Sequence, residues 1–139
     1  MNALPEWRLP ITTTLVVSTA IATRDFQDVH HDRDLAQSYG SQDIFLNILT
    51  TTGLVQRYVT DSLGEVDLAG IALRLGAPAY PGDELVFTGI RDGDTVSVVG
   101  AVSRDSQARG DHVTATVTLR PPVVEEGRQG PSRNPGSLA

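Results

Sequence analysis

Residues 43–61, DIFLNILTTTGLVQRYVTD, decide the fold, because they hold the one long helical pattern of the chain. Apolar residues recur there at the spacing of one helical face. These residues are Ile44, Phe45, Ile48, Leu49, Val55 and Val59. Asp43 is placed to cap the first turn. Residues 44–60 contain no Asp or Glu, so we expect this helix to be buried on most sides.

The middle of this helix is a poor helix former. Residues 50–53 read TTTG, and each lowers helix stability by about 0.5 to 1 kcal/mol relative to alanine. Packing against a sheet must therefore supply the missing stability, and an isolated peptide of this sequence should not be helical.

The sequence from residue 66 onward changes to a period of two, which is typical of β-strands. Four strand candidates occupy residues 66–76, 83–91, 94–104 and 111–120. In the last candidate, one face carries Val113, Ala115, Val117 and Leu119, and the other carries Thr114, Thr116, Thr118 and Arg120. Turn sequences separate the candidates, and we therefore predict an antiparallel meander.

Two shorter patterns precede the helix. After a short lead at residues 1–10, residues 11–26 are rich in β-branched side chains and are predicted to form a first strand. Residues 32–40, DRDLAQSYG, fit a short helical turn with Asp32 as the N-cap and Gly40 as the stop. One strand, one long helix and several antiparallel strands predict an α+β fold, in which a single sheet wraps around one central helix.

The domain is expected to span residues 1–122. Residues 123–139 are polar and rich in Gly, Pro and Ser, so they are expected to form a disordered tail.

The composition excludes several classes of function. The 139 residues carry a net charge of −6 and only 5% aromatic residues, which argues against a nucleic-acid-binding protein. The chain contains no cysteine and no lysine, so disulfides, thiolate ligands and lysine Schiff bases are all excluded. Because it shows neither a membrane-spanning apolar run nor a secretory signal, we expect a cytoplasmic protein.

Residues 25–32, DFQDVHHD, concentrate acidic and histidine side chains. An exposed polar loop is one explanation. A metal site is a second, since Asp25, Asp28, His30, His31 and Asp32 are potential ligands, although no recognised metal spacing is present. Acid–base catalysis is a third, because a carboxylate and an imidazole can orient and deprotonate one water. Spacing alone does not decide among the three.

The same residues carry a resemblance to the MaoC-like, or R-specific, enoyl-CoA hydratases of the hotdog fold. The hydratase motif D-x-N-P-x-H-x-D, followed by an alanine and a glycine, is matched at Asp25, His30, Asp32, Ala36 and Gly40. A second segment, LRLGAPAYPGDELVFTG at residues 73–89, resembles the family's PGD turn and the strand after it. The resemblance covers roughly residues 15–119.

The resemblance implies a mechanism. Asp25 and His30 would hold a water between them, with His30 as the main base, for addition across the α,β double bond of an enoyl-CoA. Asp32 would support the site by capping the helical turn that follows it. Gly40 would be a second supporting residue. No cofactor is implied, because the substrate itself carries coenzyme A, and no metal is expected.

The chain departs from the family at two places. Gln27 and Asp28 replace the Asn-Pro pair, and Asn47 replaces the glycine that starts the long helix. In the family, the backbone N–H of that glycine binds the thioester oxygen, so Asn47 would have to supply its own N–H. His31 is read as structural, and His112 as part of an exposed turn without a role.

With these departures, the sequence resembles the small subunits of heteromeric hydratases that act on steroid side chains in bacterial cholesterol catabolism. The resemblance implies a larger MaoC-like hotdog partner with an additional domain, in a heterodimer or heterotetramer, and contact with a downstream aldolase through that partner. Two alternatives stay open. One is a homodimeric R-specific hydratase for shorter acyl-CoAs, and the other is a non-catalytic hotdog scaffold.

Overall fold

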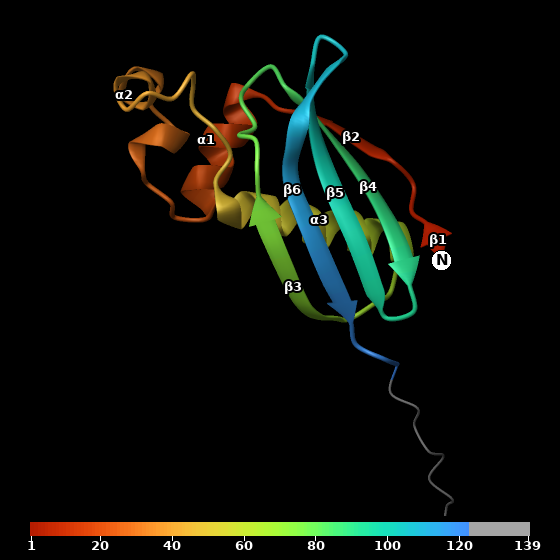
Figure 1. The fold of residues 1–139 in the computed structure, drawn as a ribbon. Coiled ribbons are helices and arrows are strands. Elements are labelled where there is room, and N and C mark those ends of the chain that lie inside the picture. Colours follow the sequence, from red (N-terminus) through yellow and green to blue (C-terminus); the bar gives the residue numbers. More distant parts are fainter. Residues whose placement is uncertain (123–139) are drawn as a thin grey trace, which may run out of the picture.

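The computed structural model describes residues 1–122, and it confirms the predicted α+β architecture. One antiparallel sheet packs against a long helix, α3 (Ile48–Leu63). Of the two shorter helices, one lies beside the start of α3 and the other lies farther out (Figure 1). The predicted tail at residues 123–139 lies outside the described residues.

Six strands form the sheet within this part of the chain. They are β1 (Asn2–Ala3), β2 (Trp7–Pro10), β3 (Leu68–Leu75), β4 (Glu84–Asp92), β5 (Thr95–Arg104) and β6 (Gln107–Leu119). Their order in the sheet is β1-β4-β5-β6-β3, and β2 also pairs with β4. All four strands expected after residue 65 are therefore confirmed.

The predicted meander is only partly right. β4, β5 and β6 follow one another as antiparallel neighbours, but β3 pairs with β6, with Leu73 opposite Ala115. The segment between β3 and β4 contains Pro78 and Pro81 and crosses to the far side of the hairpins instead of forming a tight turn. Residues 1–10 were expected to be a short lead before the fold, but they form two strands, β1 and β2, which both pair with β4.

The long helix starts later than the sequence indicates. Asn47, not Asp43, is its N-cap, since the Asn47 side-chain oxygen accepts a hydrogen bond of 2.9 Å from the N–H of Thr50. Asp43 instead accepts hydrogen bonds from the N–H of Ile44 and from the Arg33 guanidinium. The buried face also differs, because Ile48 and Leu49 are about half exposed. The buried residues of α3 are Thr50, Thr51, Leu54, Val55, Tyr58 and Val59.

The predicted first strand is wrong, because residues 13–22 form the helix α1 (Thr13–Ala22). Thr12 caps it by accepting a hydrogen bond from the N–H of Leu15. Val16 and Ala20, one turn apart, are both buried, so helical packing outweighs the β-propensity of the segment. The hydroxyls of Thr19 and Thr23 donate to carbonyls four residues back, which adapts two β-branched residues to the helix.

The core lies between α3 and the facing side of the sheet. The Phe87 ring of β4 stacks between Tyr58 of α3, at 5.7 Å between centroids, and Trp7 of β2, at 5.2 Å. Burial of each such ring contributes about 1.5 to 3 kcal/mol. Gly100 of β5 makes room for this packing, since a Cβ there would lie 2.8 Å from Val113 and 3.1 Å from Phe87.

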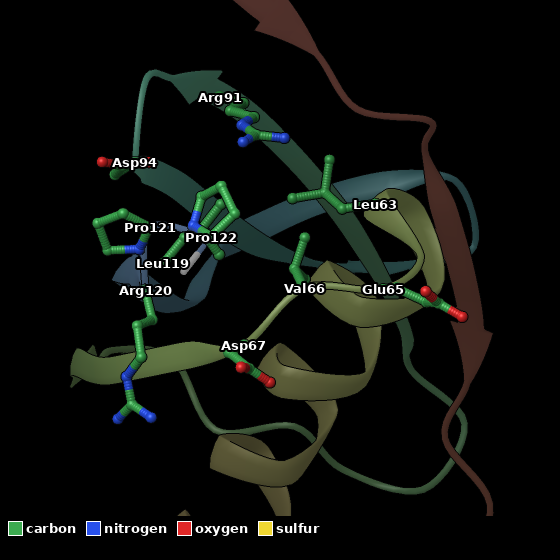
Figure 2. Close-up of a pocket in the computed structure, with 10 residues that line it drawn as sticks. All are labelled: Leu63, Glu65, Val66, Asp67, Arg91, Asp94, Leu119, Arg120, Pro121 and Pro122. Atoms are coloured by element: carbon green, nitrogen blue, oxygen red, sulfur yellow. The ribbon is translucent and has the colours of Figure 1, made fainter. Parts of the chain in front are cut away.

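The far end of α3 borders a hollow of about 740 Å³ (Figure 2). Leu63 and Val66 lie on one side of it, and Arg91, Arg120 and Pro122 surround the rest. None of the residues of the DFQDVHHD cluster lines this hollow, because that cluster lies at the opposite, N-terminal end of α3. Within residues 1–122, no helix is long and apolar enough to cross a membrane.

Candidate active site

Asp25 is positioned by the turn that ends α1. The N–H of Asp25 donates to the carbonyl of Ala20 at 2.9 Å, and the N–H of Arg24 donates to that of Ile21 at 3.0 Å. This pair of hydrogen bonds is a Schellman motif, in which the residue after the C-cap adopts the left-handed conformation. Arg24 does so with φ of 55°. The backbone of Asp25 is therefore fixed by the end of α1 and not by a mobile loop.

His30 is positioned by a short 3-10 turn, η1 (Asp28–His30), and its side chain is buried. Its Nδ1 lies 2.8 Å from the carbonyl oxygen of Phe45, and the Phe45 ring packs edge-on against the imidazole. A carbonyl oxygen only accepts hydrogen bonds, so Nδ1 carries a proton. In the neutral imidazole, Nε2 therefore presents a lone pair.

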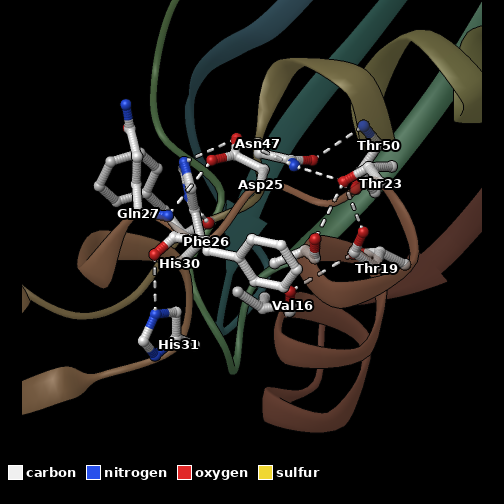
Figure 3. Close-up of polar contacts among 12 residues, drawn as sticks. Val16, Thr19, Thr23, Asp25, Phe26, Gln27, His30, His31, Asn47 and Thr50 are labelled. Carbon is white, nitrogen blue, oxygen red and sulfur yellow. Dashed lines mark hydrogen bonds and ion pairs between the residues drawn. The ribbon is translucent and has the colours of Figure 1, made fainter.

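The Nε2 of His30 faces the carboxylate of Asp25, with 3.4 Å between Nε2 and Oδ2 (Figure 3). The His30 side chain is 7% exposed and that of Asp25 is 22% exposed, so the pair is reached from the Asp25 side. A lone pair on Nε2 and a carboxylate oxygen both accept hydrogen bonds, and one water beside the pair could donate to each. The structure thus brings together the two residues predicted to be catalytic.

Asn47 joins this pair from the start of α3. Its side-chain Nδ2 donates to Asp25 Oδ2 at 3.1 Å and to the Thr23 hydroxyl at 2.8 Å (Figure 3). The side chain is buried, and its oxygen is used by the helix cap. Asn47, predicted to support the site through its backbone, therefore contacts Asp25 through its side chain.

The first turn of α3 also offers backbone donors near Asp25. In the described part of the chain, no residue accepts a hydrogen bond from the N–H of Asn47 or Ile48. Such free N–H groups carry the positive end of the helix dipole. They can stabilise negative charge that develops on a substrate oxygen.

Asp32 and Gly40 lie outside the site and shape the helix that follows it. Asp32 caps α2 (Arg33–Ser38) by accepting a hydrogen bond of 3.1 Å from the N–H of Leu35. Gly40 has φ of 91°, and its N–H donates to the carbonyl of Gln37 at the end of α2. The predicted cap and stop are both confirmed, and their link to the site is through the backbone only.

The remaining polar residues of the cluster have separate contacts. His31 is partly exposed, and its Nε2 lies 3.2 Å from the carbonyl oxygen of Phe26 and 3.9 Å from Asp28. Within residues 1–122, no three His, Asp or Glu side chains gather closely enough to hold a metal ion.

The prediction for His112 is wrong, because this residue is buried and not part of an exposed turn. Gly100 pairs with Val113 and Ala101 pairs with Asp111, so His112 is the extra residue of a β-bulge. The bulge turns His112 inward beside Val113, where strict alternation would place it outside. Its Nε2 lies 2.8 Å from the Thr51 hydroxyl, and burial lowers its pKa.

Sequence reasoning also missed two threonines near the site. Thr23 accepts a hydrogen bond from Asn47, and the buried hydroxyl of Thr50 has no hydrogen-bond partner within the described residues. For Thr50, the available signal was an asparagine three residues before a run of threonines, which is the spacing of a helix N-cap.

Comparisons with known proteins find similar chains over most of the length of this one. The chain is 57% identical over 122 residues to the 3-oxo-4,17-pregnadiene-20-carboxyl-CoA hydratase beta subunit of Mycobacterium tuberculosis, covering 84% of this chain and 91% of that protein. It also matches a chain of the crystal structure of the ChsH1-ChsH2 complex from Mycobacterium tuberculosis. The TM-score is 0.73 at 50% identity, over 86% of this chain and 96% of that one.

A more distant likeness concerns the fold alone. The (R)-hydratase from A. caviae involved in PHA biosynthesis superposes with a TM-score of 0.67 at 16% identity, over 88% of this chain and 98% of that one. No protein-family model matches the chain.

Proposed function

This chain belongs to the MaoC-like hydratases of the hotdog fold, and we propose that it is the catalytic small subunit of a heteromeric enoyl-CoA hydratase acting on steroid side-chain thioesters. The hotdog fold expected from the sequence is confirmed by the structural likenesses. The single observation that carries the catalytic role is the His30–Asp25 pair, with Nε2 and Oδ2 facing each other across 3.4 Å.

The proposed reaction begins with a water that lies beside this pair and donates a hydrogen bond to each group. His30 Nε2 accepts a proton from the water while its oxygen bonds to the β carbon of the enoyl thioester. The electron pair of the double bond moves toward the thioester carbonyl, which becomes enolate-like. The proton then returns from the Asp25–His30 pair to the α carbon, so the product contains one added water and the enzyme is restored.

The developing negative charge on the thioester oxygen requires hydrogen-bond donors. The free N–H groups of Asn47 and Ile48 at the start of α3 support this role, because the side chain of Asn47 already contacts Asp25. Removal of one donor of this kind typically slows catalysis about 10² to 10³-fold.

Partner dependence is supported by the apolar surface around the site. Large hydrophobic side chains are exposed on the segments that border it: Ile21, Phe26, Leu35, Tyr39, Ile48 and Leu49. Such a surface is typical of a protein–protein or ligand interface. One relative is described as a beta subunit and another as part of a ChsH1-ChsH2 complex. Both descriptions support a second hotdog chain that covers this apolar surface.

The test is a hydration assay with a steroid side-chain enoyl-CoA and a short straight-chain enoyl-CoA. The chain is assayed alone and after co-expression with a larger hotdog subunit. We expect turnover of the steroid substrate only in the complex. Turnover of the short substrate by the chain alone would instead indicate a self-sufficient homodimer.

The catalytic residues are tested in the same complex. Asp25→Asn and His30→Ala should each lower kcat about 10² to 10⁴-fold. The matched control is Asp61→Asn, because Asp61 lies in an exposed ion pair with Arg57 on α3, away from Asp25. Unchanged turnover of both site variants would mean that the chain is a scaffold and that its partner is catalytic.

A further inference from the structure

Both the oxygen and the nitrogen of the Asn47 carboxamide form hydrogen bonds. Its oxygen accepts the hydrogen bond from Thr50 N–H that caps α3, while its nitrogen donates to Asp25 Oδ2 and to the Thr23 hydroxyl. The residue is only 3% exposed. One buried side chain therefore links the end of α1, the carboxylate of Asp25 and the start of α3.

The oxygen that Asn47 holds is the one that faces His30. Oδ2 of Asp25 lies 3.1 Å from Asn47 Nδ2 and 3.4 Å from His30 Nε2. Within residues 1–122, the other oxygen, Oδ1, accepts only a long hydrogen bond of 3.4 Å from the N–H of Gln27. Rotation of a carboxylate about its last torsion has a shallow energy profile, so a donor at fixed distance is needed to set its plane.

We infer that Asn47 is a positioning residue, which orients the Asp25 carboxylate toward His30 and fixes it relative to the backbone donors of α3. The inference rests on the proposed function and adds to it the part played by this side chain. A glycine at the start of α3 would leave the backbone donors in place but would have no carboxamide to hold Asp25. In this chain, the Asn47 side chain fixes the Asp25 carboxylate relative to the backbone donors at the start of α3.

A purely structural role predicts a different result from a positioning role. If Asn47 only caps α3, a residue that caps equally well should preserve catalysis. Serine and aspartate are both good N-caps. Serine is too short to reach Asp25, and aspartate has the shape of asparagine but offers the Asp25 carboxylate an acceptor in place of a donor.

The experiment compares Asn47→Ser and Asn47→Asp with the wild type, each co-expressed with the larger subunit. Both variants should assemble, and kcat should fall about 10²-fold while KM changes less than about threefold, because the loss is one of geometry and not of binding. The matched control is Thr12→Asp, which places an acidic N-cap on α1. Thr12 caps a helix start and donates nothing to Asp25, so kcat should not change.

A double-mutant cycle tests the contact without reference to catalysis. Asn47→Asp alone should lower the Tm of the complex, because two carboxylates face each other. Asp25→Asn combined with Asn47→Asp should recover part of this Tm, since an amide again faces a carboxylate, while the hydrogen bond to Thr23 stays lost in both proteins. A double variant that is no more stable than Asn47→Asp alone would overturn the inferred contact.

The outcomes separate the inference from the proposed function. A wild-type complex that hydrates no enoyl-CoA would overturn the proposed function. An active wild type with unchanged kcat in Asn47→Ser would overturn the positioning role alone.

Discussion

His112 of β6 and Thr51 of α3 form a buried hydrogen bond of 2.8 Å, which links the sheet to the first turns of the central helix. The other ring nitrogen, Nδ1, lies 2.8 Å from the carbonyl oxygen of Ala77. Since that oxygen only accepts, Nδ1 carries the proton and Nε2 accepts from the Thr51 hydroxyl. One imidazole thereby connects α3, β6 and the segment between β3 and β4.

His112→Ala should lower the free energy of unfolding by about 2 to 4 kcal/mol. The substitution leaves the Thr51 hydroxyl and the Ala77 carbonyl without a partner and opens a cavity beside Val113. Chemical denaturation measures the change, and Thr114→Ala on the exposed face of β6 is the control. Equal stability of the two variants would contradict the structural role of His112.

The stability of the protein should fall as the pH drops below 6.5. Burial lowers the pKa of His112 from its ordinary value of 6.5, partly offset by the hydrogen bond to Ala77. Below 6.5 the unfolded chain binds a proton at His112 while the folded chain does not yet, so protonation favours unfolding. The contribution is complete above pH 6.5 and is lost on acidification, at up to about 1.4 kcal/mol for each pH unit.

The measurement compares the unfolding free energy of the wild type and His112→Gln between pH 7.5 and pH 5. Glutamine does not titrate, so the difference between the two proteins should shrink toward low pH. A difference that is constant over this range would refute the assignment to His112.

Arg24→Gly should raise the free energy of unfolding by about 0.5 to 1 kcal/mol. Arg24 has φ of 55°, where an L side chain is strained and glycine is not. The variant should keep its hydratase activity, because the turn that places Asp25 is preserved. Arg24→Val is the opposing variant, and we expect it to lower both stability and kcat, since a β-branched residue resists this conformation.

Two glycine-to-alanine substitutions should have opposite signs. Gly100→Ala should destabilise the protein by about 1 to 3 kcal/mol, because the new methyl would lie 2.8 Å from Val113. Gly53→Ala on α3 meets nothing within 4 Å and should stabilise by about 0.5 to 1 kcal/mol. Thermal unfolding measures both effects. A Gly100→Ala variant that is not destabilised would contradict the close contact with Val113, and a destabilised Gly53→Ala variant would contradict the open space at that position.

The strands after residue 65 were predictable because each alternates with a period of two along a half-buried sheet. β6 shows the limit of this reasoning, since the bulge at His112 shifts the alternation by one residue and no sequence signal marks it. The order of the strands was also hidden, because the pairing of β3 with β6 joins residues far apart in the chain.

The helices were harder to predict for a related reason. α1 is built from residues that favour strands, and only the burial of Val16 and Ala20 shows why a helix is preferred. For the site, Asp25 and His30 were found from the motif, whereas the side-chain role of Asn47 depends on where α3 begins. That start is set by tertiary contacts, and the boundaries of helices and strands are the least predictable part of a fold.

The proposed acid–base pair of Asp25 and His30 is assembled over short distances along the chain. The bond from His30 to Phe45 spans 15 residues and that from Asn47 to Asp25 spans 22, whereas the bond from Thr51 to His112 spans 61. Closing a short loop costs less entropy and occurs sooner. The two residues proposed to be catalytic can therefore meet early in folding, while the contact of α3 with the bulge of β6 closes a longer loop and forms later.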